Sequence, residues 1–411
     1  MVDLKEREMN KILSELVKNL DISDTADTYI RESYKAVGEW LSKPESPLYE
    51  FDVDIRPQGS YRLGTTIKPI DPNDDIDVDL VCELKGKLTN WTQRDVKQAV
   101  GARIKANETY KKMLDEEGRR CWTLLYREGS DQGHYHMDIL PSIIDREYND
   151  RVTKMLREAK ADKYDWDDVA IRITDRKSEN YTTSTNELEW LKSNPFGYAQ
   201  WFKLRCQYNQ KRSFSVFNES VQPLPAKNAP KMPLQKVVQL LKRHRDVYYG
   251  GDEDKPISII ITTLAAKAYS GEEDLVSALK RITNNMEGYI KVKYSEKYGK
   301  EIKVIENPVN PEENFADKWP EHPRKEEVFY DWLRQLNQDV QKLLISDMPE
   351  VIELLKSCFG ADVTKKTFSK FANDTKDGIK SGKTRMTSTG LLSSTGTISI
   401  NASHNFYGSD D

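Results

Sequence analysis

The chain has 411 residues, 37% of them hydrophobic and 32% charged, with a formal net charge of −4 at pH 7. These values are typical of a globular protein large enough for two lobes, and they exclude collagen-like and wholly disordered classes. A net negative chain has no general attraction for nucleic acid, so we expect no long nucleic acid as a partner.

The membrane, secretory and disulfide classes are also disfavoured. No apolar stretch reaches bilayer length, and residues 1–20 mix acidic and basic residues at helical spacing instead of forming a signal peptide. We therefore expect a cytoplasmic protein without membrane contact. The four cysteines are far apart with no CxxC pair, which predicts buried thiols rather than a zinc ribbon or a disulfide framework: Cys82, Cys121, Cys206 and Cys358.

The first third of the chain predicts two helices followed by a sheet. Apolar residues at three- and four-residue spacing favour helices over 3–20 and 24–43. The pattern then changes to strands separated by a single helix over about 91–114. The expected strands are 50–56, 76–84, 121–127 and 134–140. This part of the chain is therefore of the α/β type.

Helices dominate the second half, which predicts a helical lobe. The expected helices are 195–212, 233–249, 256–270, 272–287, 324–344 and 349–358. Prolines between 308 and 323 mark an extended crossing within this lobe. From about Ser381 the chain is rich in Ser, Thr and Gly, so we expect residues 381–411 to form a flexible tail.

The most informative segment is "GSYRLGTTIKPIDPNDDIDVDLVCEL", residues 59–84. Residues two apart on a strand share a face about 7 Å apart, so Asp77 and Asp79 point the same way. Two ionised carboxylates repel each other unless a cation lies between them, and their oxygens favour Mg²⁺ or Mn²⁺. The alternative is a polar strand end with solvated acids. "DDIDVD" also permits a second register, with Asp75 and Asp77 as the pair.

A second strand, "HYHMDILPSI", adds Asp138 to the polar face, because Met137 and Ile139 alternate with it. Three carboxylates on neighbouring strands are enough to hold two metal ions for a phosphoryl or nucleotidyl transfer. Gly59 and Ser60 open a turn whose backbone N–H groups attract anions, which supplies a phosphate site. His136 shares the face of Asp138, and a half-exposed strand histidine is its simpler interpretation.

Together these motifs resemble the polymerase-β-type nucleotidyltransferases, and among them the group of oligoadenylate synthetase, cGAS and the bacterial cGAS/DncV-like enzymes (CD-NTases). The match lies in Gly59-Ser60, in "DVDLV" from Asp77, and in "MDILP" around Asp138. The resemblance implies a bilobal polymerase-β-like α/β (α+β) core with N-terminal helices and a helical C-terminal lobe. It favours Asp77, Asp79 and Asp138 as the catalytic metal ligands. The expected division is 1–45, 46–215, 216–380 and the tail 381–411.

The resemblance extends into the helical lobe. "NPFGYAQWFKLR", 194–205, resembles the segment that links the lobes in bacterial members. "LQKVVQLLKRHRD" and "PISIIITTLAAKAY" resemble the paired helices that hold the donor triphosphate, which implies that Lys242 and Ser258 contact phosphate. Lys242 lies in the basic run Lys242 to Arg245, for which a solvated helix face is the alternative.

By this resemblance the chain is a cyclic oligonucleotide synthase that uses two Mg²⁺ (or Mn²⁺) ions. It would convert nucleoside triphosphates, with ATP expected among them, into a cyclic di- or trinucleotide messenger for bacterial anti-phage (CBASS) signalling. In the tail, "HNFYG" before the last three residues resembles the ends on which operon-encoded regulatory partners act in some bacterial defence systems, and a disordered terminus without a role is the alternative. Two alternatives remain open: a template-independent RNA- or tRNA-tailing enzyme, and an inactive nucleotide-binding module.

Overall fold

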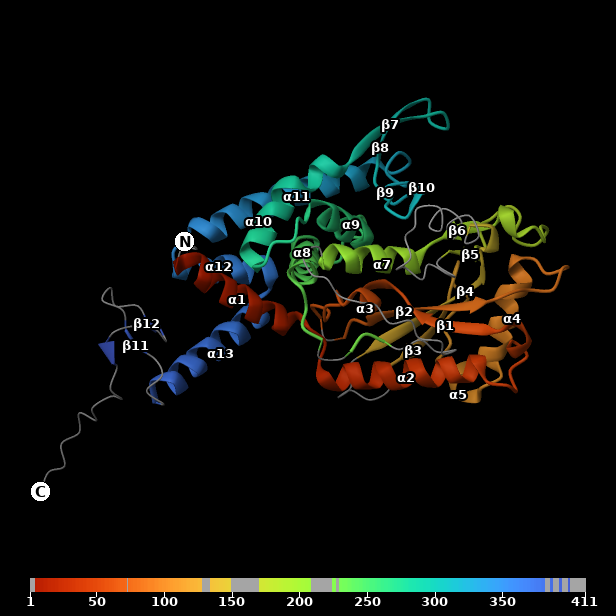
Figure 1. Ribbon diagram of the computed structural model, residues 1–411, viewed down its shortest axis with the longest axis horizontal. Coiled ribbons are helices and arrows are strands. Elements are labelled where there is room, and N and C mark those ends of the chain that lie inside the picture. The colour runs from red at the N-terminus through yellow and green to blue at the C-terminus, as the bar shows by residue number, and fades with distance from the viewer. Residues whose placement is uncertain are drawn as a thin grey trace, which may run out of the picture.

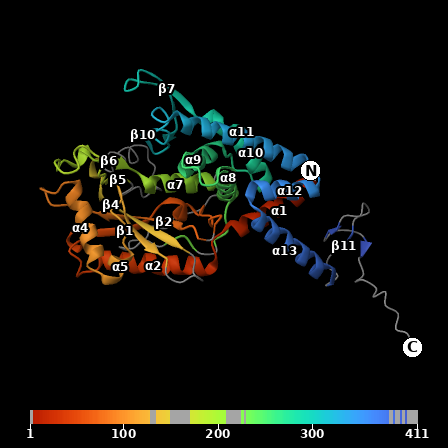
Figure 2. The ribbon, with the colours of Figure 1, turned by 180° about the vertical axis from the view of Figure 1, so that it is seen from behind.

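The computed structural model of the chain describes residues 4–71, 73–127, 134–148, 170–207, 224–226 and 229–380, with three short strands beyond them. Two lobes lie side by side, one built around a sheet and one built of helices (Figure 1). The view from behind shows the same division, with α13 running outward from the helical lobe (Figure 2). Most of the predicted tail lies outside the described residues.

In the described part of the chain, one sheet of six strands forms the centre of the first lobe. The strand order is β1-β2-β4-β5-β6. Along the edge of β4 that faces away from β2, β3 pairs with the first half of β4 and β5 pairs with its last residues. β2 and β4 are parallel, whereas the other pairs are antiparallel. The bounds are β1 Val53–Pro57, β2 Ile76–Leu84, β3 Trp122–Tyr126, β4 Tyr135–Ile144, β5 Ile171–Ile173 and β6 Leu191–Ser193.

Helices cover both faces of this sheet. α2, Asp24–Ser42, buries Ile30, Tyr34 and Leu41 in one core with the strands, and Ser23 caps its first turn by accepting the amide of Ala26. α7, Pro195–Cys206, covers the other face, where its Phe196 packs on Val81 and Leu140 of the central strands. The sheet is therefore buried along most of its length.

The single helix expected over 91–114 is wrong, because the structure has two. α4 spans Gln93–Lys105 and α5 spans Glu108–Met113, and Asn107 begins the second by accepting the amides of Thr109 and Tyr110 with its side chain. An asparagine that bonds to the following backbone offers an alternative to continuing a helix, which is the physical reason for the break. α3 is a short helix, Gly59–Leu63, between β1 and β2.

The second lobe has its own core, formed mainly by helices that the sequence predicts. It also contains α13, which the apolar spacing did not single out, and two small hairpins within the segment expected to be helical or extended. The helices are α8 Pro233–Tyr249, α9 Ser258–Ala268, α10 Leu275–Asn285, α11 Pro323–Ile345, α12 Met348–Phe359 and α13 Ala361–Lys380. The hairpin strands are β7 Lys291–Ser295, β8 Lys300–Val304, β9 Glu306–Asn307 and β10 Asn310–Asn314.

The two N-terminal helices, which the sequence places in one unit, pack into different cores. α1, Leu4–Leu20, buries Leu13, Leu16 and Leu20 in the helical core, whereas α2 packs on the sheet. The junction between them at residues 21–23 therefore connects the lobes. None of the helices in the described residues is long and apolar enough to cross a bilayer. Past α13, the paired strands are β11 Arg385–Met386, β12 Leu392–Ser393 and β13 Ile398–Ser399.

The packing of α4 on the sheet yields a stability prediction. A Cβ atom built on Gly101 would lie 2.3 Å from Cζ2 of Trp122. Trp122 is 1% exposed, and its indole N–H donates to the carbonyl of Lys97. We expect Gly101→Ala to lower the free energy of unfolding by about 1–3 kcal/mol, because the indole has no room to move. Urea unfolding of the full chain measures this.

Gly288→Ala is the control, because no heavy atom lies within 4 Å of a Cβ built at Gly288. We expect this variant to unfold at the urea concentration of the wild type or slightly above it. Equal losses for the two variants would contradict the packing argument.

Candidate active site

Three carboxylates come together on the polar face of the central strands. Asp77 and Asp79 alternate along β2 with the buried side chains of Val78 and Leu80. In the parallel register of β2 and β4, Asp79 lies opposite Asp138. Because residues opposite one another in a sheet share a face, the pairing of these two strands places the acids side by side.

The electrostatics of Asp79 confirm this crowding. Its burial, with the negative charges of Asp138 and Asp77 beside it, raises the pKa of the Asp79 carboxyl to about 6, while His136 and Lys242 act in the opposite direction. Among the described residues no lysine or arginine forms an ion pair with any of the three acids. A cluster of carboxylates without a lysine or arginine ion pair has the donor set and the charge that a divalent cation requires.

Gly59 lies directly against Asp79. The amide of Gln58 donates to the carbonyl of Asp79 over 2.9 Å, which draws the turn onto the strand. A Cβ atom built on Gly59 would lie 1.9 Å from Oδ2 of Asp79, and the φ angle of Gly59 is +63°. Only glycine satisfies both the left-handed backbone and the contact with the carboxylate.

Each of the other two acids has a polar neighbour on the adjacent strand. The hydroxyl of Thr123 on β3 donates to Oδ1 of Asp138 over 2.5 Å. Nε2 of His136 on β4 lies 3.1 Å from Oδ1 of Asp77. Nothing in the sequence pattern singles out Thr123, although a β-strand directly before the "HYHMD" segment was expected. The strand histidine is half-buried, as the sequence predicts, but it faces an acid.

The structure places the acids of the two candidate registers in different surroundings. Asp75 precedes β2, whose first residue, Ile76, pairs with Tyr135. Nη2 of Arg127 lies 3.0 Å from Oδ2 of Asp75, so this acid already has a cationic partner. The arrangement supports Asp77 and Asp79 as the pair that faces Asp138.

The turn at Gly59-Ser60 connects to the helical lobe through the loop that follows it. The amide of Thr65 donates to the carbonyl of Ser60, and the Ser60 and Thr66 hydroxyls lie 3.1 Å apart. Nζ of Lys242 on α8 donates to the carbonyl of Thr65 over 3.0 Å. The GS turn, its loop and Lys242 therefore form one continuous structure beside the acids.

One face of α8 is bonded to this loop along its length. Four side chains spaced at helical intervals donate to carbonyl oxygens of residues 63–68. The pairs are Gln235 with Leu63, Gln239 with Thr66, Lys242 with Thr65 and Arg243 with Lys68. Because these bonds cross between the lobes, they fix the helix relative to the GS turn.

The alternative that the basic run is a solvated helix face is wrong. Lys242, Arg243, His244 and Arg245 are between 2% and 7% exposed. Burial, with the charge of Arg245 nearby, lowers the pKa of the Lys242 ammonium to about 8, while Asp246, Asp77 and Asp79 raise it. Lys242 is thus close enough to the acids to interact with them electrostatically. The run is buried because its side chains find carbonyl and carboxylate acceptors inside the protein.

Ser258 is the first residue of α9, and its hydroxyl accepts a hydrogen bond from Nη1 of Arg245 over 2.9 Å. Arg245 also donates to the carbonyl of Pro256. The structure therefore places Ser258 beside the helix that carries Lys242. Of these two residues, Lys242 is the one whose charge affects the pKa of Asp79.

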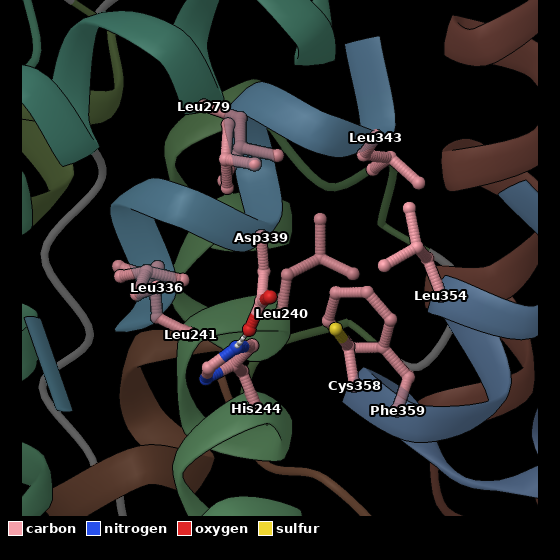
Figure 3. Close-up of a pocket in the computed structure, with 11 residues that line it drawn as sticks. Leu240, Leu241, His244, Leu279, Leu336, Asp339, Leu343, Leu354, Cys358 and Phe359 are labelled. Atoms are coloured by element: carbon pink, nitrogen blue, oxygen red, sulfur yellow. Dashed lines mark hydrogen bonds and ion pairs between the residues drawn. The ribbon is translucent and has the colours of Figure 1, made fainter. Parts of the chain in front are cut away.

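A second cluster of possible metal ligands lies deep in the helical lobe, where His244, Asp339 and Cys358 are surrounded by leucines (Figure 3). Nδ1 of His244 accepts from the indole N–H of Trp332 over 3.1 Å, and Nε2 lies 3.1 Å from Oδ2 of Asp339. Because tryptophan only donates, the proton of the neutral imidazole is on Nε2 and faces the carboxylate. Burial raises the pKa of Cys358 to about 12, which keeps its thiol protonated. This cluster is a hydrogen-bond network that joins α8 to α11.

Comparison with known proteins gives relatives over most of the chain. A family model described as the Second Messenger Oligonucleotide or Dinucleotide Synthetase domain (SMODS) matches residues 8–164. A protein of Roseivirga ehrenbergii named c-di-GMP synthase is 28% identical over 361 residues, which are 86% of this chain and 85% of that protein. The cyclic dinucleotide synthase CdnG of Bradyrhizobium diazoefficiens is 23% identical over 381 residues, 88% of this chain and 83% of its own.

Solved structures share the fold. The CD-NTase CdnG of Bradyrhizobium diazoefficiens in complex with GTP superposes with a TM-score of 0.61 at 20% identity, covering 89% of this chain and 99% of its own. The Escherichia coli CdnC–HORMA complex gives 0.57 at 15% identity, with 86% and 97% covered. A variant of the Vibrio cholerae dinucleotide cyclase DncV with ATP and GTP gives 0.51 at 15% identity, with 89% and 92% covered. The fold is the polymerase-β-like fold of these enzymes, as the sequence predicts.

The contact of Gly59 with Asp79 predicts a loss of stability and of metal affinity in Gly59→Ala. The methyl group would displace the Asp79 carboxylate, and the left-handed backbone adds about 1–2 kcal/mol of strain. We expect a lower melting temperature and weaker Mn²⁺ binding, measured by calorimetry on the full chain.

Gly299→Ala is a matched control, because Gly299 has a φ of +61° and no heavy atom lies within 4 Å of a Cβ built on it. It should show the backbone strain alone and bind Mn²⁺ normally. If both variants bound Mn²⁺ as the wild type does, Gly59 would not position Asp79.

Proposed function

We propose that the chain is a cyclic dinucleotide synthase of the bacterial cGAS/DncV-like kind (CD-NTases), which joins two nucleoside triphosphates. In each step a ribose hydroxyl of one nucleotide attacks the α-phosphate of the other, a phosphodiester forms, and pyrophosphate leaves with the hydroxyl proton passing to solvent. The second, intramolecular step closes the ring. The observation that supports this most is the group of three acids beside the Gly59-Ser60 turn.

A divalent cation fits the site by its donor set. Asp77, Asp79 and Asp138 would hold Mg²⁺ or Mn²⁺. Burial and the charges of Asp138 and Asp77 raise the pKa of Asp79, and such an ion would relieve the repulsion among the three acids. We propose two ions. When bound, they supply Lewis-acid stabilisation of the charge that develops on the transferred phosphoryl group and lower the pKa of the attacking hydroxyl.

The protein's own groups would hold the donor triphosphate. The backbone amides at Gly59 and Ser60 would bind phosphate oxygens, because glycine allows their close approach. Lys242 would add a positive charge from the helical lobe, and Ser258 a hydroxyl from the start of α9. A buried ammonium interacts strongly with phosphate because little water screens it, and the bond from Lys242 to Thr65 aligns it with the GS turn.

The relatives bear on the substrate. Their names, c-di-GMP synthase and CdnG, and the GTP bound in one solved structure favour GTP as the first nucleotide to test, next to the ATP expected from the sequence. We further propose that the product is a messenger in anti-phage (CBASS) signalling. The CdnC–HORMA complex is consistent with control by a partner protein, although the tail proposed for such a contact lies mostly outside the described residues.

A product assay tests the function. The purified chain is incubated with labelled ATP, GTP or all four triphosphates and with Mg²⁺ or Mn²⁺, and the products are treated with phosphatase and separated by chromatography. Small phosphatase-resistant products support the proposal. Products formed only with added RNA would indicate the tailing enzyme, and no turnover under any condition would favour the inactive nucleotide-binding module.

The choice of acids predicts the effect of four substitutions. Asn at position 77, 79 or 138 keeps the shape of the side chain but removes a charged ligand, so each variant should lose roughly a thousandfold in rate, or about 4 kcal/mol of barrier. Melting temperature should hold or rise, because one like charge leaves a crowded site. Initial rates at saturating Mg²⁺ measure the loss.

Asp75→Asn is the internal control and should keep most of the activity, since Arg127 already pairs with that carboxylate. An inactive Asp75→Asn together with an active Asp79→Asn would mean that Asp75 and Asp77 form the metal pair.

The proposed phosphate contact of Lys242 predicts the effect of a second set of substitutions. Lys242→Ala should raise the KM for the triphosphate and lower kcat, with a combined loss of about 2–4 kcal/mol, typical of a charge-assisted contact in a desolvated site. Arg243 is an unsuitable control because it is buried and donates to the carbonyl of Lys68. Lys236→Ala on the same helix serves instead, and equal effects on KM at 236 and 242 would indicate diffuse electrostatics.

A further inference from the structure

Asp77 is the most exposed member of the acidic group, with 73% of its side chain accessible. In the described part of the chain, its one polar side-chain contact is with His136. An exposed aspartate samples several staggered rotamers, and a metal ligand is effective only in those that direct its oxygens at the ion. The packing of the sheet does not restrict the rotamer of Asp77. A metal ligand at this position therefore needs a neighbouring group that holds its carboxylate.

His136 is placed to do so. It lies opposite Asp77 in the register of β2 and β4, so both side chains are on the face that carries Asp79 and Asp138. The distance of 3.1 Å between Nε2 of His136 and Oδ1 of Asp77 is one at which a ring N–H donates to a carboxylate oxygen. The second oxygen of Asp77 is left available.

The opposite edge of the ring faces a second, fixed acid. Nδ1 of His136 lies 3.7 Å from Oδ2 of Asp75, which is too far for a hydrogen bond. Asp75 is itself held by Arg127 at 3.0 Å, and its side chain is 14% exposed. Arg127, Asp75, His136 and Asp77 thus form a continuous chain from the edge of the sheet to the site.

We propose that His136 is a positioning residue that orients the Asp77 carboxylate toward the metal site. The inference rests on the proposed function. Asp138 has a comparable partner in the hydroxyl of Thr123, and Asp79 is confined by Gly59, so each of the three acids has its own restraint. Partners of ligating carboxylates commonly change metal affinity or activity by about 10–100-fold.

Two amide substitutions separate this role from a general structural one. In His136→Gln the amide nitrogen reaches the place of Nε2, whereas in His136→Asn it is one methylene short and reaches only the place of Nδ1. Both variants are polar, uncharged and of similar size. His134→Asn is the matched control, because His134 precedes the same strand and its ring contacts the carbonyl of Asn73 rather than an acid.

The readout is the Mn²⁺ dissociation constant of the full chain without nucleotide, measured by isothermal titration calorimetry, together with the Mg²⁺ dependence of kcat and KM. We expect His136→Asn to bind Mn²⁺ about 10–100-fold more weakly, with kcat reduced more than KM is raised. His136→Gln should recover most of the affinity, and His134→Asn should match the wild type. If His136→Asn does not fold, His136→Ser replaces it, since it also lacks a donor at the Nε2 position.

Wild-type Mn²⁺ affinity in His136→Asn, or equal losses in the Asn and Gln variants, would overturn the proposal. These outcomes are distinguishable from a failure of the proposed function. In that case the wild-type chain would form no product from any triphosphate, and Asp79→Asn would bind Mn²⁺ as well as the wild type does.

Discussion

The repulsion among Asp77, Asp79 and Asp138 is the constraint on which the rest of the site depends. Three carboxylates on one face of two parallel strands repel one another in the free protein, and the pKa of Asp79 is raised by its burial and by the charges of Asp138 and Asp77. The fold maintains them because Val78 and Leu80 are buried on the other face, so a slip of one residue would expose the core. The free energy of the hydrophobic core therefore holds a charge arrangement that is suited to a divalent cation.

The second lobe supports the acidic site through hydrogen bonds from α8. Glutamine, lysine and arginine side chains of one helix face donate to carbonyls of residues 63–68, directly after the GS turn. The same helix is fixed from behind, where His244 bonds to Asp339 and Trp332 of α11. Because the helix is held on both sides, the fold positions Lys242 before any ligand arrives, which would lower the entropy cost of the proposed contact with phosphate.

Local sequence patterns correctly predicted the helices and strands whose formation depends on residues close together in the chain. β2 begins and ends where its apolar run does, and α8 spans the predicted 233–249, because periodic burial acts within each segment. The predictions failed where one side chain or a distant contact decides. Asn107 breaks the helix expected over 91–114, and α13 packs against α1, at the other end of the chain. The burial of Arg243 likewise depends on an acceptor at Lys68.

For the site itself, the sequence by itself determined the chemistry. Acids at alternate positions before an apolar strand, and a glycine that opens a turn, indicate their chemistry by residue type and spacing, which are visible in the sequence alone. Only the tertiary structure decided which acids meet, because strand register is set by contacts between segments far apart in the chain. That register places Asp79 beside Asp138 and His136 beside Asp77, and leaves Asp75 with Arg127. Spacing along one strand contains no information about its neighbour, and so the pairing of Asp75 with Arg127 and of His136 with Asp77 emerged only from the assembled sheet.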